Sequence, residues 1–252
     1  MNNLICKRAA LNSGLTDIEL KELIDIAKEC AELGGKVLMD NFGKIKSVKC
    51  KGNSGDLVTN ADTECEKLVI DSLENKTPNI SILAEESGYK SKESRLKWCI
   101  DPLDGTTNYA HGYPFFACSI GLLWDSNPIL GAISIPTLEE IYFASPHCGA
   151  FLNEDKISVT STNKLEDSLL VTGFAYDRRN VIDNNYSEFC WLTHRTHGVR
   201  RGGAAAVDLA FVAAGRVDGY WERGLAKWDL AGGIPIVEMA GGLVTNYPDG
   251  NF

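Results

Sequence analysis

The stretch CIDPLDGTTN, residues 99–108, decides how the rest of the chain is interpreted. The apolar residues that lead up to Asp101 predict a short buried strand. Pro102 favours an extended conformation for the residue before it, so we expect the strand to end at Asp101, with its carboxylate at the edge of a sheet. Asp104 follows three residues later, where the turn can bring both carboxylates and the Leu103 carbonyl toward one cation. Oxygen ligands of this kind suit Mg²⁺ or Mn²⁺.

The same stretch contains a candidate phosphate site. Gly105 allows the backbone to approach an anion closely, and the amides of Gly105 and Thr106 can face a phosphate. An ordinary surface turn is the alternative, because Asp, Pro and Gly are common turn residues. The Asp-x-Asp-Gly-Thr signature of the haloacid-dehalogenase phosphatases fits poorly, because two residues rather than one separate Asp101 from Asp104. The spacing therefore favours a pair of metal ligands over a nucleophile.

Three further segments place acidic residues at the ends of predicted elements. The β-branched run at residues 80–83 predicts a strand that leads into Glu85 and a glycine-containing turn, although a solvated acidic loop is the alternative. Asp62 follows an extended segment and starts a predicted helix, so helix capping alone could explain it. Asp229 is likewise predicted to cap a buried helix. No one of these three segments decides the function by itself.

In combination, the four segments resemble the inositol monophosphatase family of metal-dependent, lithium-sensitive phosphatases. The resemblance implies the family fold, a mixed α/β or α+β sandwich of alternating layers, αβαβα. The similarity covers most of the chain, from about residue 20 to residue 249, and its most specific parts are residues 55–62, 84–87, 98–108 and 228–233.

The resemblance also implies roles for individual residues. Asp62, Thr106 and Glu85 are the implied catalytic residues, the first two because they orient the attacking water. Lys51 matches a family lysine near the site. The implied metal ligands are Glu85, Asp101, the Leu103 carbonyl, Asp104 and Asp229. The implied substrate-binding residues are Gly105, Thr106, Gly203, Ala205 and Glu222.

The sequence departs from the family pattern in four places. Ala84 stands where relatives have glycine, which is tolerable if its φ angle is not positive. Residues 203–205 lack the hydroxyl that many relatives carry, which leaves the substrate preference open. Pro235 lies within the helix that Asp229 is expected to begin, and should bend it. The chain stops at Phe252, where relatives continue for a strand and a terminal helix, so its C-terminal end is short by comparison.

The predicted organisation is an N-terminal extension, residues 1–15, and one phosphatase domain of two fused α/β halves, residues 16–252. The extension lacks the long apolar core of a secretion signal and is expected to be flexible. Folded structure should begin with a capping box at Thr16 and Glu19 and a helical apolar stripe that ends at Gly43. Strands are predicted at 117–124, 129–135, 140–144 and 169–171, the first three as an antiparallel meander, and helices at 184–196 and 204–214.

Composition and charge exclude several classes of protein. The chain has 252 residues, 44% of them hydrophobic, which is enough for a substantial core. It has no long apolar run, so we expect no membrane span. A net charge of −9 disfavours nucleic acid as a partner, and clustered cations would have to reverse the local field before a phosphate could bind. Eight cysteines without a Cys-x-x-Cys pair predict reduced thiols in a cytoplasmic protein.

Together these features predict a Mg²⁺-dependent phosphatase acting on a small-molecule phosphate monoester. Two or three Mg²⁺ ions, for which Mn²⁺ could substitute, would activate water without a phosphoenzyme. myo-Inositol monophosphate is the first choice of substrate, because Glu222 suits hydroxyls and Thr107 and Asn108 follow the inositol-phosphatase form. Histidinol phosphate and sugar bisphosphates stay open. So does a non-catalytic, protein-binding role for the fold, although no acidic ligand is missing. The resemblance further implies a homodimer.

Overall fold

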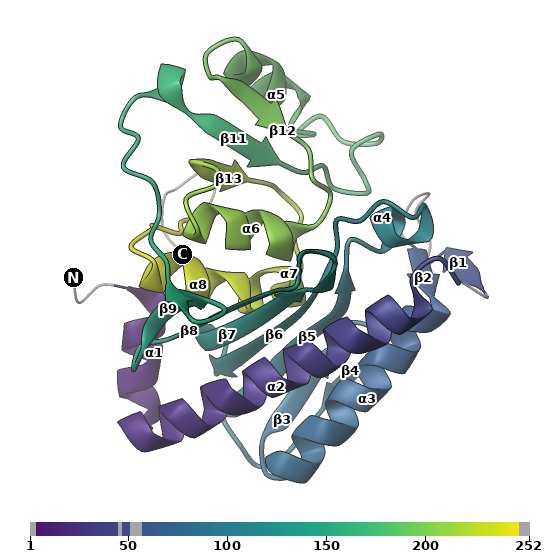
Figure 1. Cartoon of the computed structure of the whole chain (residues 1–252), viewed down its shortest axis with the longest axis vertical. Coiled ribbons are helices and arrows are strands. Elements are labelled where there is room, and N and C mark those ends of the chain that lie inside the picture. Colours follow the sequence, from purple (N-terminus) through teal and green to yellow (C-terminus); the bar gives the residue numbers. More distant parts are fainter. Residues whose placement is uncertain (1–3, 45–46, 51–56, 247–252) are drawn as a thin grey trace.

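A mixed eight-stranded sheet runs through the centre of the molecule (Figure 1). The computed structural model describes residues 4–44, 47–50 and 57–246. The strands of this sheet are β3 (Ser81–Ala84), β4 (Gly88–Lys90), β5 (Leu96–Asp104), β6 (Ala117–Trp124), β7 (Asn127–Ile135), β8 (Glu140–Ser145), β9 (Gly149–Leu152) and β10 (Asp155–Lys156). Their order in the sheet is β10-β9-β8-β7-β6-β5-β3-β4. The central strands β6 and β7 are buried along almost their whole length, as expected for a sheet covered by helices on both faces.

Strand pairing brings two predicted acidic segments together. From β5 to β10, successive strands are antiparallel, which confirms the predicted meander. Strands β3 and β5 are parallel, with Ala84 opposite Ile100, so the residues that follow both positions emerge at the same sheet edge. The prediction that the strand ends at Asp101 is wrong: β5 continues through Pro102 to Asp104. A register shift against β6 between Asp101 and Asp104 marks a bulge, a place where a strand accommodates proline.

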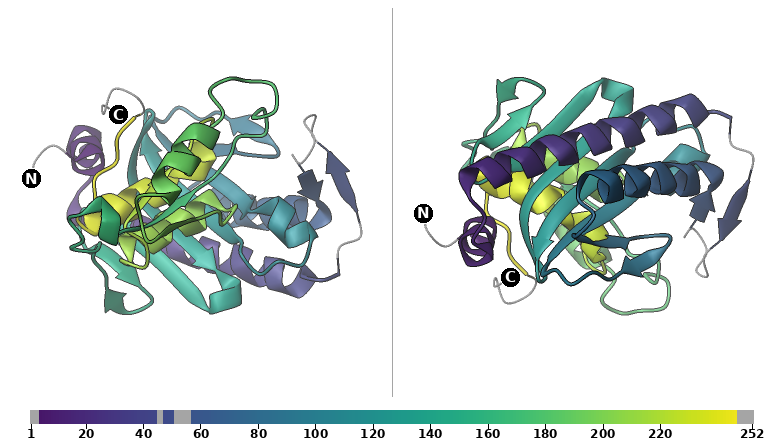
Figure 2. Two further views of the ribbon diagram at one scale, coloured as in Figure 1. Left: turned by 90° about the horizontal axis from the view of Figure 1, so that it is seen from above. Right: turned by 90° about the horizontal axis from the view of Figure 1, so that it is seen from below.

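Helices and a second sheet complete five layers (Figures 1 and 2). One face of the large sheet is covered by α2 (Asp17–Asn41) and α3 (Asn60–Lys76), and the other by α6 (Ala205–Ala213), α7 (Lys227–Ala231) and α8 (Gly233–Met239). Beyond α6 lies a parallel sheet of β11 (Leu169–Thr172), β12 (Gly198–Arg200) and β13 (Gly219–Trp221), with β11 in the middle. Helix α5 (Tyr186–Thr193) packs against β12 as the outermost layer. The predicted αβαβα sandwich is therefore confirmed.

The remaining described elements are short. Strands β1 (Val48–Cys50) and β2 (Leu57–Thr59) form an antiparallel pair, and α4 (Thr106–Ala110) follows β5 directly. Single turns of 3₁₀-helix occur at Pro136–Leu138 and Leu165–Asp167. Among the described residues, no helix combines the length and the apolar character needed to cross a membrane.

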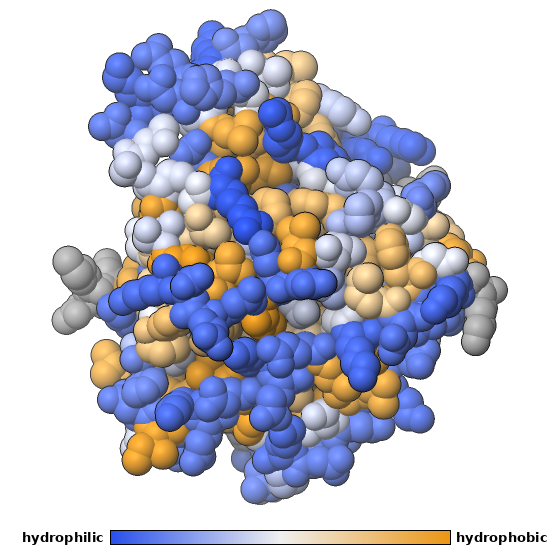
Figure 3. All heavy atoms as spheres, viewed as in Figure 1, coloured by the Kyte–Doolittle hydropathy of each residue, from blue (hydrophilic) through white to orange (hydrophobic). Residues whose placement is uncertain are grey.

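Helix α2 follows the sequence prediction closely. The Thr16 hydroxyl accepts a hydrogen bond from the Glu19 amide at 3.3 Å, and the Glu19 carboxylate accepts one from the Thr16 amide at 2.8 Å, which completes the capping box. The apolar stripe faces the sheet, while hydrophilic side chains line the outward face of the helix (Figure 3). Gly34 lets α2 approach the sheet, because a Cβ atom there would lie 2.4 Å from the Cys118 sulfur. The helix ends at Asn41, two residues before the predicted Gly43.

The N-terminal segment differs from the prediction. A flexible extension was expected over residues 1–15, but Ile5–Ser13 form helix α1. Its first turn is held by Glu238 of α8, whose carboxylate accepts hydrogen bonds from the Ile5 and Cys6 amides at 3.0 Å each. Ile5 and Cys6 also pack against Ile234. The prediction failed because a nine-residue helix with little capping signal in its own sequence is stabilised by a partner more than two hundred residues away.

Two helices replace the single bent helix expected after Asp229. Helix α7 ends at Ala231 and α8 begins at Gly233, so Pro235 falls in the first turn of α8, where a backbone donor is not needed. Close packing accompanies this break: a Cβ atom on Gly121 of β6 would lie 2.4 Å from the Ala231 carbonyl carbon. Glycine at this position therefore lets α7, and with it Asp229, lie directly on the sheet.

Candidate active site

The bulged end of β5 forms the floor of the candidate site. Asp101 is only 2% exposed, and its Oδ1 accepts a hydrogen bond from the Leu103 amide at 3.1 Å. Gly105 follows with a φ angle of 87°, in the left-handed region that favours glycine. A Cβ atom on Gly105 would lie 2.9 Å from the Phe115 carbonyl oxygen. The tight turn after β5 thus depends on glycine for both its backbone angle and its packing.

Asp104 joins the end of β5 to the start of helix α6. Its Oδ1 accepts a hydrogen bond from the Ala205 amide at 2.9 Å, and its Oδ2 accepts one from the Ala206 amide at 2.8 Å. The carboxylate therefore satisfies amides that would otherwise be unpaired in the first turn of the helix, where negative charge is favoured. The predicted substrate-binding residue Ala205 is accordingly found with its amide bonded to Asp104.

Asp62 and Thr106 come from different elements and meet in the interior. Asp62 does not cap helix α3 as predicted; Thr59 is the N-cap, and Asp62 accepts the Thr59 amide from the third helical position at 2.8 Å. The Thr106 hydroxyl lies 3.1 Å from Asp62 Oδ1 and 3.0 Å from the Leu103 carbonyl oxygen. Because a hydroxyl has one proton for these two acceptors, it can donate to only one at a time.

Helix α7 supplies Asp229, again from the third helical position and not from the predicted cap. Its Oδ2 accepts a hydrogen bond from the Ala226 amide at 2.6 Å. Both helices that carry acidic site residues thus begin with the same arrangement, in which the carboxylate reaches back to the residue before the helix.

The acidic side chains influence one another electrostatically. Burial raises the pKa of Asp101 well above its usual value, and the neighbouring charges of Glu85, Asp104 and Asp229 raise it further. Burial, with Asp229, raises the pKa of Asp104 to about 8, against the lowering effect of the α6 amides. The pKa of Asp62 is raised by burial, while its hydrogen bonds from Thr59 and Thr106 act in the opposite direction. The carboxylates of Glu85, Asp101, Asp104 and Asp229 thus converge on a region where negative charge is costly without a cation.

Oxygen donors of this kind suit Mg²⁺ or Mn²⁺. Within the described ranges, no three acidic, histidine or cysteine side chains surround one point closely enough to hold a metal ion as they stand. Asp101, Asp104 and Asp229 instead accept backbone amides. Each carboxylate oxygen retains a second lone pair, so a cation could bind without displacing these amides. The oxygen donors therefore fit a hard cation. The carboxylates interact electrostatically, but their present distances do not form a coordination sphere.

Glu85 begins the turn between β3 and β4. Its amide donates to the Ile100 carbonyl at 3.2 Å, which ties the turn to β5. Ala84, the departure from the family glycine, lies in β3 and is not among the described residues with positive φ, so alanine is tolerated there. Glu66 of α3 accepts the next two amides of the turn, a contact that the sequence prediction missed. Its signal was its position one helical turn after Asp62, on the same face of the helix.

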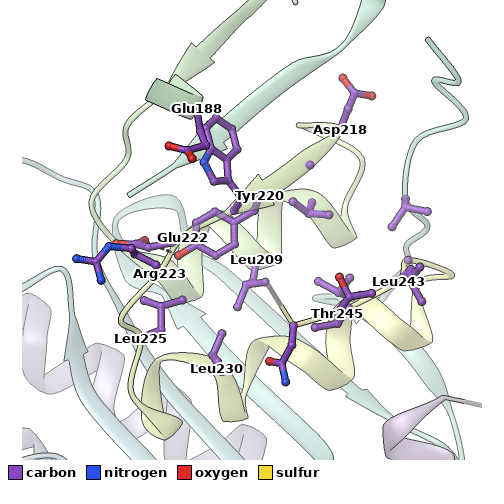
Figure 4. Close-up of a pocket in the computed structure, with 18 of the residues that line it drawn as sticks. Glu188, Leu209, Asp218, Tyr220, Glu222, Arg223, Leu225, Leu230, Leu243 and Thr245 are labelled. Carbon is purple, nitrogen blue, oxygen red and sulfur yellow. Dashed lines mark hydrogen bonds between the residues drawn. The ribbon is translucent and has the colours of Figure 1, made fainter. Parts of the chain in front are cut away.

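Two further predicted substrate residues, Gly203 and Glu222, lie in a second wall of the site, formed by the segments before α6 and after β13. Gly203 has a φ angle of 83°, and the Asn108 amide group holds the turn before it through the Gly202 carbonyl at 3.0 Å. Glu222 accepts a hydrogen bond from the Tyr220 hydroxyl at 2.6 Å (Figure 4). Burial raises the pKa of the Glu222 carboxyl, although Tyr220 and Arg201 lower it. The remaining candidate, Lys51, lies outside the described residues.

A cavity of about 640 Å³ adjoins this wall. Figure 4 shows Tyr220, Glu222 and Arg223 on one side of it and Leu209 and Leu230 on the other. The carboxylates around the end of β5 do not line the cavity. Its connection to the candidate site is Glu222, together with Leu230, the neighbour of Asp229.

A second buried carboxyl of this region escaped the sequence prediction. Asp208 of α6 is 2% exposed, and its Oδ2 has no hydrogen-bond partner among the described residues. Burial, followed by the charges of Asp104 and Glu222, raises its pKa to about 9. Its signal in the sequence was its position as the one charged residue in the apolar run 204–214, since a helix that is apolar on all sides is expected to be buried.

Alternating helical and sheet layers around a group of buried acidic side chains define a class of layered α/β phosphatases. The chain belongs to the inositol monophosphatase family, whose model matches residues 19–252. It is 48% identical over 230 residues to an inositol-1-monophosphatase from Synechocystis sp., covering 91% of this chain and 80% of that protein. A fructose-1,6-bisphosphatase/inositol-1-monophosphatase from Aquifex aeolicus is 36% identical, covering 90% and 86%.

A solved structure supports the same assignment. The inositol monophosphatase from Anabaena (Nostoc) sp. superposes with a TM-score of 0.83 at 47% identity, covering 92% of this chain and 87% of that one. The family prediction is confirmed, and the chain is a phosphatase enzyme of that family.

Proposed function

We propose that the chain hydrolyses a phosphate monoester of a small polyol, first of all myo-inositol monophosphate, in a Mg²⁺-dependent reaction. The observation that carries the proposal is the convergence of Glu85, Asp101, Asp104 and Asp229, whose charges act on one another and of which Asp101 and Asp104 are buried. Such a group is expected where cations are to be bound, because a buried negative charge without a partner is costly. The names of the Synechocystis and Anabaena relatives support the choice of substrate.

In this proposal Glu85, Asp101, the Leu103 carbonyl, Asp104 and Asp229 hold two or three ions. When bound, Mg²⁺ supplies positive charge that polarises the phosphate ester and acidifies the attacking water. Mn²⁺ offers similar chemistry to oxygen ligands.

The protein's own groups position the reactants. Asp62 and Thr106, 3.1 Å apart, would hold the attacking water on one side of the phosphorus. The amides of Gly105 and Thr106 would face the phosphate oxygens. On the second wall Glu222 would accept hydrogen bonds from hydroxyls of the substrate, near Gly203 and Ala205. Because water attacks directly, no phosphoenzyme forms and the configuration at phosphorus inverts.

The decisive experiment is a panel of phosphate esters assayed with Mg²⁺ and with EDTA. We expect turnover of inositol monophosphate with Mg²⁺ and none in chelator. Asp104→Asn should lower kcat by at least about a hundredfold, because it removes a charged ligand at almost unchanged size. Asp125→Asn is the matched control, since Asp125 is exposed and pairs with Arg95 at the surface. Full activity in EDTA, or in Asp104→Asn, would refute the metal-dependent reaction.

A sugar bisphosphate is the second candidate substrate. The Aquifex relative carries both fructose-1,6-bisphosphatase and inositol-1-monophosphatase in its name, which favours testing this class directly. The panel therefore includes fructose 1,6-bisphosphate, with histidinol phosphate as a further member. The ester with the highest kcat/KM identifies the class. Absence of turnover with every ester would favour the alternative, a protein-binding role of the fold.

We further propose that the enzyme acts in the cytoplasm as a homodimer. The eight cysteines are all free and five of them are buried, which supports a reducing compartment.

A further inference from the structure

The turn that carries Glu85 is hydrogen-bonded to a buried carboxylate of helix α3. Glu66 of α3 is only 4% exposed. Its Oε2 accepts a hydrogen bond from the Glu86 amide at 2.8 Å, and its Oε1 accepts one from the Ser87 amide, also at 2.8 Å. The two bonds use both oxygens of one carboxylate on two successive amides. We propose that Glu66 is a positioning residue that fixes the turn so that Glu85 is held where it can bind Mg²⁺.

The proposal rests on the proposed metal-dependent function and deepens it. The turn is short, joining β3 to β4 with Ala84 opposite Gly88. Its first amide, from Glu85, is bonded to the Ile100 carbonyl of β5 at 3.2 Å. Its next two amides are bonded to Glu66. Three consecutive amides are therefore satisfied from two directions, and the backbone that carries Glu85 has little freedom to move.

The same helix positions a second part of the candidate site. Glu66 lies four residues after Asp62 in α3, and residues with this spacing share one face of a helix. Asp62 contacts Thr106 beyond β5, while Glu66 contacts the turn after β3. Helix α3 thus sets the position of the water-orienting pair relative to the turn of the Glu85 ligand.

A neutral side chain cannot replace this contact. Two successive backbone amides form a concave anion site, and a carboxylate presents an acceptor to each of them. Glutamine presents one acceptor and one donor, so its amide group would face one of the two backbone donors unfavourably. The buried negative charge beside an already acidic region is costly, which is a reason to expect a functional gain from it.

Isothermal titration with Mg²⁺ tests the proposal on the purified full chain. We expect Glu66→Gln to raise the Mg²⁺ dissociation constant by about tenfold, as loss of a group that orients a metal ligand does. Glu85→Gln removes the ligand itself and should have an equal or larger effect. In the double variant the two effects should not add, because Glu66 acts through Glu85. Additive effects would overturn the proposal.

Glu238→Gln provides a matched structural control. Glu238 is 3% exposed and also accepts two successive amides, those of Ile5 and Cys6, at 3.0 Å each. It lies in α8 and contacts α1, not the turn of Glu85. Both substitutions should lower the melting temperature, but only Glu66→Gln should change the Mg²⁺ dissociation constant. An equal change in both variants would reduce Glu66 to a purely structural role and overturn the proposal.

Hydrogen exchange supplies a readout that needs no metal. In Glu66→Gln the amides of Glu86 and Ser87 should exchange faster in EDTA, while those of β5 stay protected; unchanged exchange would contradict the contact. The results also separate this inference from the proposed function. If Glu85→Gln leaves Mg²⁺ binding unaltered, the metal site is wrong. If Glu85→Gln weakens binding and Glu66→Gln does not, only the positioning role is wrong.

Discussion

Acidic residues near the end of β5 differ chiefly in what donates to their oxygens. Asp104 receives three amides of α6, Glu222 receives a tyrosine hydroxyl, and Asp208 has an oxygen with no donor among the described residues. These differences determine which carboxylates can stay ionised in the interior. They also lead to separate predictions for Glu222 and Asp208.

Glu222→Gln should alter substrate discrimination. The Glu222 carboxylate is wedged against Gly173, where a Cβ atom would lie 1.9 Å from Oε2, so the glutamine side chain should keep the same position. Its amide would then offer a donor where a substrate hydroxyl requires an acceptor. We expect KM for inositol monophosphate to rise about tenfold and KM for p-nitrophenyl phosphate to change little. Steady-state kinetics on both esters measure the two KM values. Equal changes in KM for the two esters would show that Glu222 does not contact the substrate hydroxyls.

Asp208→Asn should change how stability depends on pH. The pKa of Asp208 is raised to about 9, mainly by burial, above its ordinary value of 3.8. Between these values the folded chain keeps a proton that the unfolded chain releases, so the free energy of unfolding falls as pH rises through this window. Asparagine does not titrate, so the variant should lose less stability than the parent as pH rises. The Tm of the variant minus the Tm of the parent should increase by about 3 °C or more from pH 5 to pH 8. Thermal unfolding in EDTA measures it, and a constant Tm difference would contradict the assignment.

Single residues were predictable where their neighbours in sequence impose a spacing. Asp101 and Asp104 were found from their spacing in the sequence, although the local rule for proline ended the strand at Asp101 and the structure continues it through a bulge to Asp104. Glu66 and Asp208 were missed because their partners, the turn after β3 and the layer above α6, lie far away in sequence. The local signs were indirect: Glu66 lies one helical turn after Asp62, and Asp208 lies in an otherwise apolar helix.

At the scale of elements, helix starts show the limit of local signals. Thr16 and Glu19 form the predicted capping box. Asp62 was predicted as a cap but occupies the third helical position, because Thr59 lies three residues before it and the pair forms the same type of box. The pattern Thr-x-x-Asp was present in the sequence and would have located the helix start correctly.

Removing residues 1–14 should destabilise the enzyme. The deletion takes away helix α1, whose Ile5 and Cys6 pack on Ile234, and leaves Glu238 buried without its amide donors. An unpaired buried carboxylate alone costs about 1–3 kcal/mol. We therefore expect Tm to fall by about 4 °C or more. Differential scanning calorimetry measures Tm. An unchanged Tm would support the prediction from sequence that the N-terminal segment is a flexible extension.

At the scale of the whole molecule, the proposed homodimer has a candidate surface. Four large apolar or aromatic residues are exposed on α5 and on the segment between β11 and α5, and exposed apolar surface can mark an interface. They are Tyr176, Ile182, Tyr186 and Trp191. Ile182 is fully exposed, at 101%.

We expect Ile182→Glu combined with Trp191→Glu to convert the dimer into a monomer, because charged side chains at the centre of an apolar interface cannot be desolvated cheaply. Leu11→Glu combined with Ile18→Glu is the matched control, since Leu11 in α1 and Ile18 in α2 are also exposed apolar residues. Sedimentation velocity measures the mass. A monomeric parent enzyme would contradict the dimer, and a dimeric double variant would place its interface elsewhere.

The layered architecture followed from the family resemblance and the meander from local signals, but the pairing of the smaller sheet could not be predicted. The antiparallel order of β6, β7 and β8 follows from short turns between apolar runs. The smaller sheet joins β11 to β12 and β13, two strands of three residues each, across long connections. Strands so short carry too few residues for a periodic pattern, so their pairing is set by α6 beneath them and α5 above them.

The contact between Glu238 and helix α1 has a consequence for biosynthesis. It spans 233 residues, so α1 is synthesised long before its partner in α8. At about 5–20 residues per second, the N-terminal segment waits roughly ten to fifty seconds for its partner. During that interval Ala9 can already pack against the large sheet, but Ile5 and Cys6 lack Ile234, and their backbone amides lack the Glu238 carboxylate. The first turn of α1 should therefore stay unprotected in nascent chains until α8 has emerged.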